Sequence, residues 1–315
     1  MDIRKWSAAS VTTVLTVAMT CALWTTGAPQ GSRVVGLGSV APWGPADPRS
    51  PSLQPPVRGQ AGPIVGGLSS SSVGVLVVDG GRHRCSATVI ASDSRRLLAT
   101  AAHCVWLEGD WRVDGAFFIP GFAAGEEPYG RWSVDTAYVS PAWQDANSPI
   151  SDVAANLDYA FVSLLPRDGV LPEQVLGAQG IRFTDPAAGE AAALGYPAAG
   201  VYDGGSLRGC TGPAAIEPFA RTPELPGEIL ALDCDMTQGA SGGPWLAGPD
   251  ASSGRGQVIG VVSGGDDTAL VSPRFGPEVE QVYAAADTAA QATDPSPGRA
   301  ADPMSAQIAP RGGSS

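Results

Sequence analysis

One histidine and one serine lie in sequence contexts that suit nucleophilic catalysis. His103 follows a run of small and apolar residues in LATAAHCV (98–105), and Ser241 lies between small residues in QGASGGPWL (238–246). Histidine can take the proton of a serine hydroxyl near neutral pH, and small neighbours leave room for a substrate beside the serine. The chain has only 2 histidines, so the placement of His103 is informative. Together the two residues predict acyl transfer through a serine.

Serine catalysis also needs a buried carboxylate that fixes the tautomer of the histidine. Asp158 in NLDYAFVSL (156–164) stands at the start of a strongly apolar run. Burial of an unpaired charge at that place would be unfavourable without a partner. Asp152 lies in a polar stretch and is expected to be solvated. We therefore predict that Asp158 is the third catalytic residue.

The glycines around Ser241 predict a site for the negative charge that develops during acyl transfer. Gly239 and Gly242 allow a sharp backbone turn. The N–H groups of Gly239 and Ser241 can then converge on an oxyanion, and removal of one such donor costs about 10²–10³ in rate. Gly239 and Ser241 are therefore the predicted oxyanion hole.

Short strand-like runs must position these residues, and they predict an all-β fold of the sandwich or barrel type. Apolar residues alternate with small or polar ones in several runs, and turn formers separate them. The runs lie at residues 73–78, 86–91, 116–122, 132–139, 159–165, 191–196, 228–234 and 257–264. One helix is predicted over 276–291, beginning with Pro277 in its first turn. Its apolar positions at helical spacing are Val279, Val282, Tyr283 and Ala286.

The two ends of the chain differ in composition from the middle. Residues 1–28 are predicted to be a signal peptide, because a basic start precedes an apolar stretch. An uncleaved anchor is the less favoured alternative, since that stretch is short for spanning a bilayer. Residues 29–69 predict a Pro/Gly-rich linker or propeptide, and residues 292–315 a disordered tail. The folded part is expected at residues 70–287.

Removal of a signal peptide leaves four cysteines, Cys85, Cys104, Cys210 and Cys234. An even number in an exported chain predicts two disulfides, for which three pairings exist. The simplest pairing is local, Cys85–Cys104 and Cys210–Cys234, with about 3 kcal/mol from each bridge. A zinc site that includes His103 is the less favoured alternative, because the chain has no CxxC pair.

The order of the motifs along the chain resembles the chymotrypsin or trypsin-like serine peptidase family. AAHC (101–104) is followed by DYA (158–160) and then by GASGGP (239–244). CDMTQGASGGP (234–244) and GYP (195–197) are similar to bacterial exported members related to glutamyl endopeptidases. The resemblance covers about residues 70–287, and three motifs in this order are specific where each alone would be weak.

This resemblance implies two packed six-stranded antiparallel β-barrels with the site in the cleft between them and a C-terminal helix. Barrel 1, at about residues 70–170, would supply His103 and Asp158. Barrel 2, at about residues 171–275, would supply Ser241.

Two further features follow from the same resemblance. Cys85–Cys104 matches the bridge that fastens the histidine loop. Ser263, Gly264 and Gly265 match the segment whose backbone pairs with a bound peptide as an added strand.

The sequence departs from the trypsin pattern in its activation and specificity residues. PIVGG (63–67) resembles the N-terminus that zymogen cleavage exposes, but Ala240 stands where those enzymes carry the partner aspartate. Trypsin-style activation is therefore not expected. Asp235 lies six residues before Ser241, the spacing at which trypsin carries the aspartate that binds a basic substrate side chain. Thr237 is a second candidate for the substrate pocket. No histidine follows His103 to bind a substrate glutamate as in glutamyl endopeptidases.

These observations predict a secreted, monomeric serine endopeptidase that acts on a protein or peptide substrate. The formal net charge of −12 argues against recognition of nucleic acid through its phosphates, which requires clustered positive charge. Neither a metal ion nor an organic cofactor is expected, nor stable membrane association after signal cleavage. The alternatives are a non-catalytic exported binding protein on the same scaffold and, less favoured, an esterase with the same triad.

Overall fold

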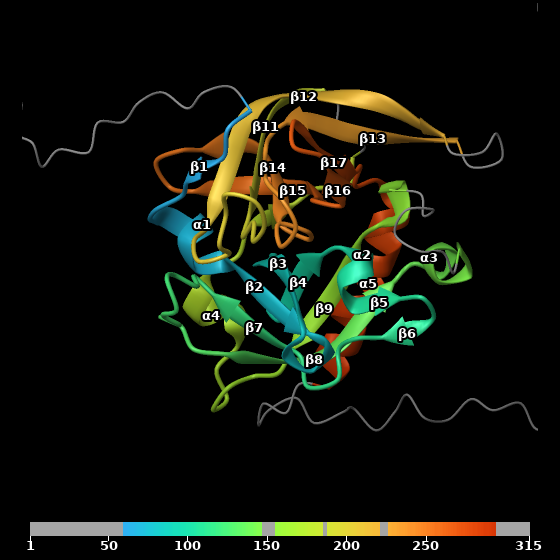
Figure 1. Cartoon of the computed structure of the whole chain (residues 1–315). Helices are drawn as coiled ribbons and strands as arrows, with labels where there is room; N and C mark the ends of the chain where they lie inside the picture. Colours follow the sequence, from blue (N-terminus) through green and yellow to red (C-terminus); the bar gives the residue numbers. More distant parts are fainter. Residues whose placement is uncertain (1–58, 147–154, 185–187, 221–225, 294–315) are drawn as a thin grey trace, which may run out of the picture. The chain divides into compact units, whose positions relative to one another are not determined.

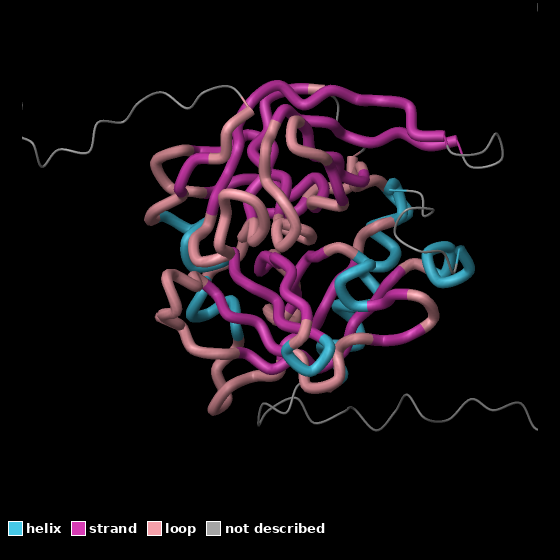
Figure 2. The backbone as a smooth tube through the Cα atoms, viewed as in Figure 1, coloured by secondary structure: helices cyan, strands magenta, loops and turns pink. Residues whose placement is uncertain are grey.

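The computed structural model describes residues 59–146, 155–184, 188–220 and 226–293, which include all of the predicted site residues. The predicted signal peptide, most of the predicted linker and residues 294–315 of the predicted tail lie outside the described residues. Strands predominate over helices in the described part (Figure 2). None of the helices described is both long enough and apolar enough to cross a bilayer.

The first half of the fold is a closed six-stranded barrel (Figure 1). Its strands, in the order in which they pair, are β2 (Val73–Val78), β3 (His83–Val89), β4 (Leu97–Thr100), β9 (Ala160–Leu164), β8 (Trp132–Val139) and β7 (Phe117–Pro120). A short hairpin of β5 (Trp106–Leu107) and β6 (Asp110–Trp111) falls between β4 and β7 in the sequence.

Every residue of β2 is buried, because both faces of this strand are covered. Leu76 and Val78 belong to one hydrophobic cluster, whereas Val73, Val75 and Val77 belong to another that includes residues of the second half. Side chains alternate between the two faces of a strand, so one set fills the barrel and the other packs against the neighbouring half.

The second half is a curled sheet of nine strands. Six longer strands run in the order β15 (Arg255–Val261), β14 (Pro244–Asp250), β11 (Gly189–Gly195), β12 (Arg208–Ala220), β13 (Pro226–Asp233) and β17 (Ala269–Pro273). The two-residue strands β1 (Gly62–Pro63), β10 (Gly180–Ile181) and β16 (Gly264–Gly265) extend it. The sheet returns toward its beginning, since the Phe275 N–H donates to the Ile259 carbonyl at 3.0 Å.

The predicted all-β fold of two barrels with a C-terminal helix is thus confirmed, and the short added strands account for the nine-stranded second sheet. The helix α5 (Pro277–Ala292) packs on β8 and β9 of the first barrel. It buries Val279 and Ala286, and Val282 and Tyr283 lie against the same core. The remaining helical segments are α1 (Gly67–Ser72), α2 (Ala102–Val105), α3 (Pro141–Ala146), α4 (Pro172–Leu176), η1 (Asp79–Gly81) and η2 (Ala155–Leu157).

Two disulfides join the predicted partners. Cys85–Cys104 links β3 to α2, and Cys210–Cys234 links β12 to the residue that follows β13. Each bridge closes a loop whose ends adjacent strands already hold together.

Candidate active site

His103 lies on a four-residue helix that the first barrel holds from two sides. The helix α2 directly follows β4, and the Cys85–Cys104 disulfide ties it to β3. The residue is buried, with 8% of its surface exposed. The imidazole is therefore carried by rigid backbone rather than by a long loop.

Asp158 lies next to His103 because β9, which begins two residues later, pairs with β4. Its Oδ1 accepts the backbone N–H of His103 at 2.9 Å, and its Oδ2 lies 2.8 Å from His103 Nδ1. The Ser263 hydroxyl donates to the same Oδ2 at 2.6 Å. The structure thus brings His103 and Asp158 together, and hydrogen bonds compensate the buried carboxylate.

These contacts set the tautomer and the basicity of His103. An ionised carboxylate only accepts hydrogen bonds, so Nδ1 carries the proton and Nε2 is left as the basic nitrogen. Burial by itself lowers the pKa of His103, but the charge of Asp158 and its hydrogen bond outweigh burial and raise that pKa above its usual value. The imidazole can therefore hold a proton that it has taken from a nucleophile.

Ser241 is half-buried, and its backbone lies against β3 and the helix α2 that carries His103. Its carbonyl accepts the Ser86 N–H at 2.7 Å and lies 3.9 Å from Cys104 Sγ, one residue from His103. Its hydroxyl makes no hydrogen bond with any described residue, His103 included. Hydrogen bonds between a nucleophile and its base are often long until a substrate is bound.

The loop before Ser241 leaves two backbone donors unused. Within the described part of the chain, the N–H groups of Gly239 and Ser241 have no acceptor, whereas the Ala240 N–H donates to Thr237 at 3.2 Å. The Gln238 carbonyl accepts the Ala198 N–H at 2.6 Å. Because the C=O and N–H of a trans peptide point in opposite directions, this bond turns the Gly239 N–H away from Ala198.

Only glycine fits at position 239. Gly239 has a φ of 97°, and a Cβ there would lie 2.5 Å from the backbone carbonyl oxygen of Tyr196. This left-handed conformation is unfavourable for other residues. The loop that carries the two predicted oxyanion donors thus requires the glycine found in the sequence.

A cavity of about 280 Å³ opens beside Ser241. The predicted substrate-binding residues Thr237, Gly264 and Gly265 line it. The rest of the lining is Met236, Gln238, Val262, Asp266, Asp267 and Leu270. No histidine and no basic residue is part of this lining among the residues described.

Asp235, another predicted substrate-binding residue, is not part of the cavity lining. Its Oδ1 accepts the backbone N–H of Ala61 at 2.8 Å and the Tyr202 hydroxyl at 2.6 Å. Its own N–H donates to the Gly59 carbonyl at 2.8 Å. The carboxylate therefore anchors the chain segment before the first barrel.

Ser263 differs from the two glycines that follow it, because its side chain points to Asp158. Gly264 and Gly265 form β16, which pairs with β17 and ends the path of the sheet. An edge strand carries backbone N–H and C=O groups that another strand can pair with.

The PIVGG segment is built into the fold of the intact chain. Pro63 pairs with Arg208 in β12, and the Ile64 N–H donates to the Leu207 carbonyl at 3.1 Å. Ala240 is fully buried. Ile64 therefore makes a backbone contact, and no carboxylate lies directly before Ser241.

The alternative of a zinc site fails on its ligands. The sulfur atoms of Cys85 and Cys104 lie close to a ring nitrogen of His103, but they are bonded to each other. Zinc binds cysteine as thiolate, which this disulfide does not provide.

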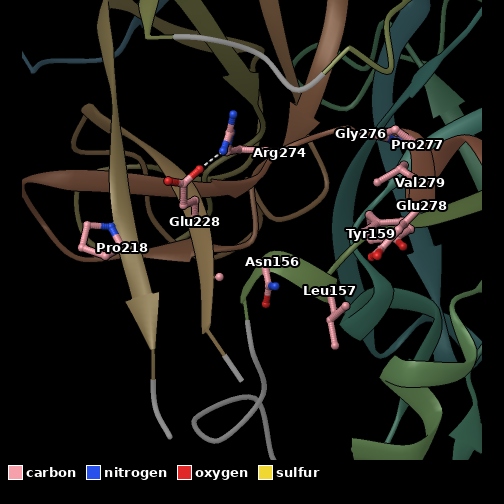
Figure 3. Close-up of a pocket in the computed structure, with 11 residues that line it drawn as sticks. Asn156, Leu157, Tyr159, Pro218, Glu228, Arg274, Gly276, Pro277, Glu278 and Val279 are labelled. Carbon is pink, nitrogen blue, oxygen red and sulfur yellow. Dashed lines mark hydrogen bonds and ion pairs between the residues drawn. The ribbon is translucent and has the colours of Figure 1, made fainter. Parts of the chain in front are cut away.

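A second cavity, of about 680 Å³, is not the site of the nucleophile (Figure 3). It lies between η2, the β12–β13 hairpin and the start of α5, and the Arg274–Glu228 ion pair is on one side of it. Its lining contains Tyr159 but neither His103 nor Ser241.

Two polar contacts of the site were not predicted from the sequence. The resemblance assigns only a backbone role to the 263–265 segment, and the sequence places Ser86 only at the start of the strand-like run 86–91. The signal for Ser86 is weak: a small polar residue directly after Cys85 in a strand whose other central residues are buried.

Comparisons with known proteins agree with this geometry. The family model for a trypsin-like peptidase domain matches residues 85–261, which include His103, Asp158 and Ser241. No curated protein sequence matches the chain significantly.

Solved structures of serine proteases share the fold. The protease Anisep from Arthrobacter nicotinovorans is 26% identical, with a TM-score of 0.60, and the match covers 72% of this chain and 97% of that one. The thermostable serine protease AL20 from an extremophilic microorganism is 28% identical, with a TM-score of 0.60 and coverage of 70% and 99%. A Glu endopeptidase at 17% identity, TM-score 0.57 and coverage of 72% and 96% shares the fold.

The family model spans more than half of the 315 residues, from the first disulfide cysteine to the end of β15. On this match, the chain belongs to the trypsin-like peptidase family.

Proposed function

We propose that the protein is a secreted serine endopeptidase that hydrolyses peptide bonds through an acyl-enzyme on Ser241. The observation that carries this proposal is the buried Asp158 carboxylate, which binds His103 at both the backbone N–H and Nδ1. Such a contact leaves Nε2 as the base of a serine nucleophile.

The reaction begins when the Ser241 hydroxyl attacks the carbonyl carbon of the scissile bond. His103 Nε2 takes the hydroxyl proton, and the negative oxygen of the tetrahedral intermediate accepts hydrogen bonds from the N–H groups of Gly239 and Ser241. The intermediate collapses as the C–N bond breaks, and His103 gives its proton to the leaving amine. Water then repeats the sequence on the ester, releasing the acid and restoring the Ser241 hydroxyl.

The substrate is held by backbone pairing and by one side-chain pocket. An extended peptide can add to the sheet edge at β16, where Gly264 offers its backbone. The side chain before the scissile bond then enters the cavity of about 280 Å³ beside Ser241. The mechanism uses neither a metal ion nor an organic cofactor.

Two features support secretion. Residues 1–28 combine a basic start with an apolar stretch, as signal peptides do, and the fold contains two disulfides. Disulfides of this structural kind form and persist in oxidising compartments. We therefore propose that the protein acts outside the cell, as a monomer.

A fluorophosphonate probe tests the proposal on the purified protein. We expect stoichiometric labelling of Ser241 with loss of peptide hydrolysis, and no labelling of Ser241→Ala. Labelling that survives in Ser241→Ala would contradict the assignment. A folded protein that is neither labelled nor active on any peptide would instead be the non-catalytic binding protein.

A further inference from the structure

Ser86 connects the first barrel to the loop that carries the nucleophile. It follows Cys85 in β3 and is fully buried. Its N–H donates to the Ser241 carbonyl at 2.7 Å, and its hydroxyl donates to the Gly239 carbonyl at 2.8 Å. One residue of the first barrel thus contacts the backbone of both oxyanion donors of the second.

The Ser86 hydroxyl is used in both directions. Its oxygen accepts the Tyr196 N–H at 2.9 Å while its proton is donated to Gly239. A serine hydroxyl can donate once and accept, so both of its roles are filled. An alanine would leave the half-buried Gly239 carbonyl and the buried Tyr196 N–H without the partner that Ser86 provides.

The contact matters because Gly239 has no side chain that would restrict its backbone. A glycine reaches conformations on both sides of the φ map, so its N–H direction depends on what its neighbouring peptides bind. The Ala198 N–H holds the peptide before Gly239, through the Gln238 carbonyl at 2.6 Å. The Ser86 hydroxyl holds the peptide after it. The two bonds together fix the Gly239 N–H.

We propose that Ser86 is a positioning residue that holds the Gly239–Ser241 loop in the shape that binds an oxyanion. This rests on the proposed function, in which the Gly239 and Ser241 N–H groups stabilise the tetrahedral intermediate. The interaction is formed in the intact chain, without a new N-terminus. It therefore holds the loop through hydrogen bonds that need no charged residue at position 240.

Ser86→Ala is the first test, with Thr88→Val as the matched control. Thr88 is a fully buried hydroxyl residue on the same strand, and its one hydroxyl contact among the described residues is to the Val89 carbonyl, at 3.5 Å. We expect kcat for a peptide amide to fall by about tenfold to a hundredfold in Ser86→Ala, with KM within twofold. Removal of an oxyanion donor costs about 10²–10³ in rate. The expected fall in kcat is smaller, because in Ser86→Ala the Gly239 N–H remains but is misdirected. Thr88→Val should keep kcat within twofold.

A tetrahedral inhibitor separates positioning from general destabilisation. In Ser86→Ala the inhibition constant of a peptidyl aldehyde should rise by the same factor by which kcat falls, since both depend on the oxyanion donors. An unchanged kcat in folded Ser86→Ala, or an equal loss in Thr88→Val, would overturn the proposal. Fluorophosphonate labelling of the parent protein is measured alongside: an unlabelled parent refutes the proposed function, whereas a labelled parent with an unaffected variant refutes only the role of Ser86.

A second measurement needs no variant and stays decisive if Ser86→Ala does not fold. In a crystal structure of the parent protein with the aldehyde bound to Ser241, Ser86 Oγ should remain within hydrogen-bonding distance of the Gly239 oxygen. A Gly239 carbonyl turned away from Ser86 while the oxyanion is bound would refute the proposal.

Discussion

Asp235 accepts the backbone N–H of Ala61 at 2.8 Å, so a residue six positions before Ser241 binds chain that lies 174 residues earlier. The Asp235 carboxylate also accepts the Tyr202 hydroxyl. Both contacts turn the carboxylate away from the cavity beside Ser241, whose lining it does not join. The cavity beside Ser241 is consequently formed without this charge.

Asp235→Asn should leave the preference for the cleaved residue unchanged while it alters Tyr202. Burial, followed by the hydrogen bond and the charge of Asp235, raises the pKa of Tyr202 to about 12. Loss of the negative charge should lower that pKa toward its usual value of 10. Absorbance titration of tyrosinate measures the change, and Tyr202→Phe identifies the step that belongs to this residue. A loss of cleavage after Arg or Lys in peptide-library profiling would place Asp235 in the pocket after all.

The pH dependence of kcat/KM should follow His103. Its pKa is raised above the ordinary 6.5, because the charge and hydrogen bond of Asp158 outweigh burial. Activity needs the neutral base, so kcat/KM should rise with a midpoint above 6.5. The same shift stabilises the fold below the unfolded pKa, and this contribution is lost as pH rises through the folded value. A midpoint below 6.5 in initial-rate profiles would contradict the geometry.

Asp158→Asn should lower kcat by about 10⁴, because an amide in this position can donate to Nδ1 and favours the wrong tautomer of His103. The measurement is steady-state hydrolysis of a peptide amide, with circular dichroism to confirm folding. Asp114→Asn is the control, since Asp114 is an exposed carboxylate outside the site. A retained kcat in Asp158→Asn would remove the residue from the mechanism.

The two disulfides should differ in their effect on catalysis more than in their effect on stability. Their sequence separations are 19 and 24 residues, so each should contribute a similar amount, about 3 kcal/mol, to the free energy of unfolding. Only Cys85–Cys104 fixes the helix that bears His103. We expect the double alanine variant at 85 and 104 to lose more kcat than that at 210 and 234, with similar losses in denaturant midpoint. Equal kcat in the two variants would show that α2 is held without its bridge.

Local sequence patterns were sufficient for some of the elements. The alternating run at 132–139 coincides with β8. The helix predicted over 276–291 is α5, which begins and ends one residue later. β12 was missed because the glycines and prolines of its 13 residues interrupt any alternation. It forms through pairing with β11 and β13, which a local pattern does not contain. The end of the predicted linker similarly holds β1 and the start of α1.

The candidate triad was predictable because each of its residues lies in a distinctive short motif. The contacts of Asp235 and Ser86 were not, since their partners lie far along the chain: 174 residues for Ala61 and 153 for Gly239. No local signal records such pairings: Ala61 reaches Asp235 when β1 pairs with β12 in the second sheet, and Ser86 reaches Gly239 when the two halves pack. Residue type also misled at Asp235, because a carboxylate near a nucleophile suits a pocket as well as an anchor.

The stretch from Gly59 to Ile64 has a consequence for maturation. In the zymogens that PIVGG resembles, scission ahead of the isoleucine liberates a charge that completes the catalytic apparatus. Here Pro63 belongs to β1 and the Ile64 N–H donates to the Leu207 carbonyl, so the Pro63–Ile64 bond is held at the sheet. The residue before Ser241 is the buried Ala240, which has no carboxylate to pair with a new N-terminal amine. Severing the Pro63–Ile64 bond would strip a strand from the sheet and loosen the hold on Asp235. For the processing that we propose, we therefore expect the mature N-terminus to lie at or before Gly59, where a cut would leave these contacts in place.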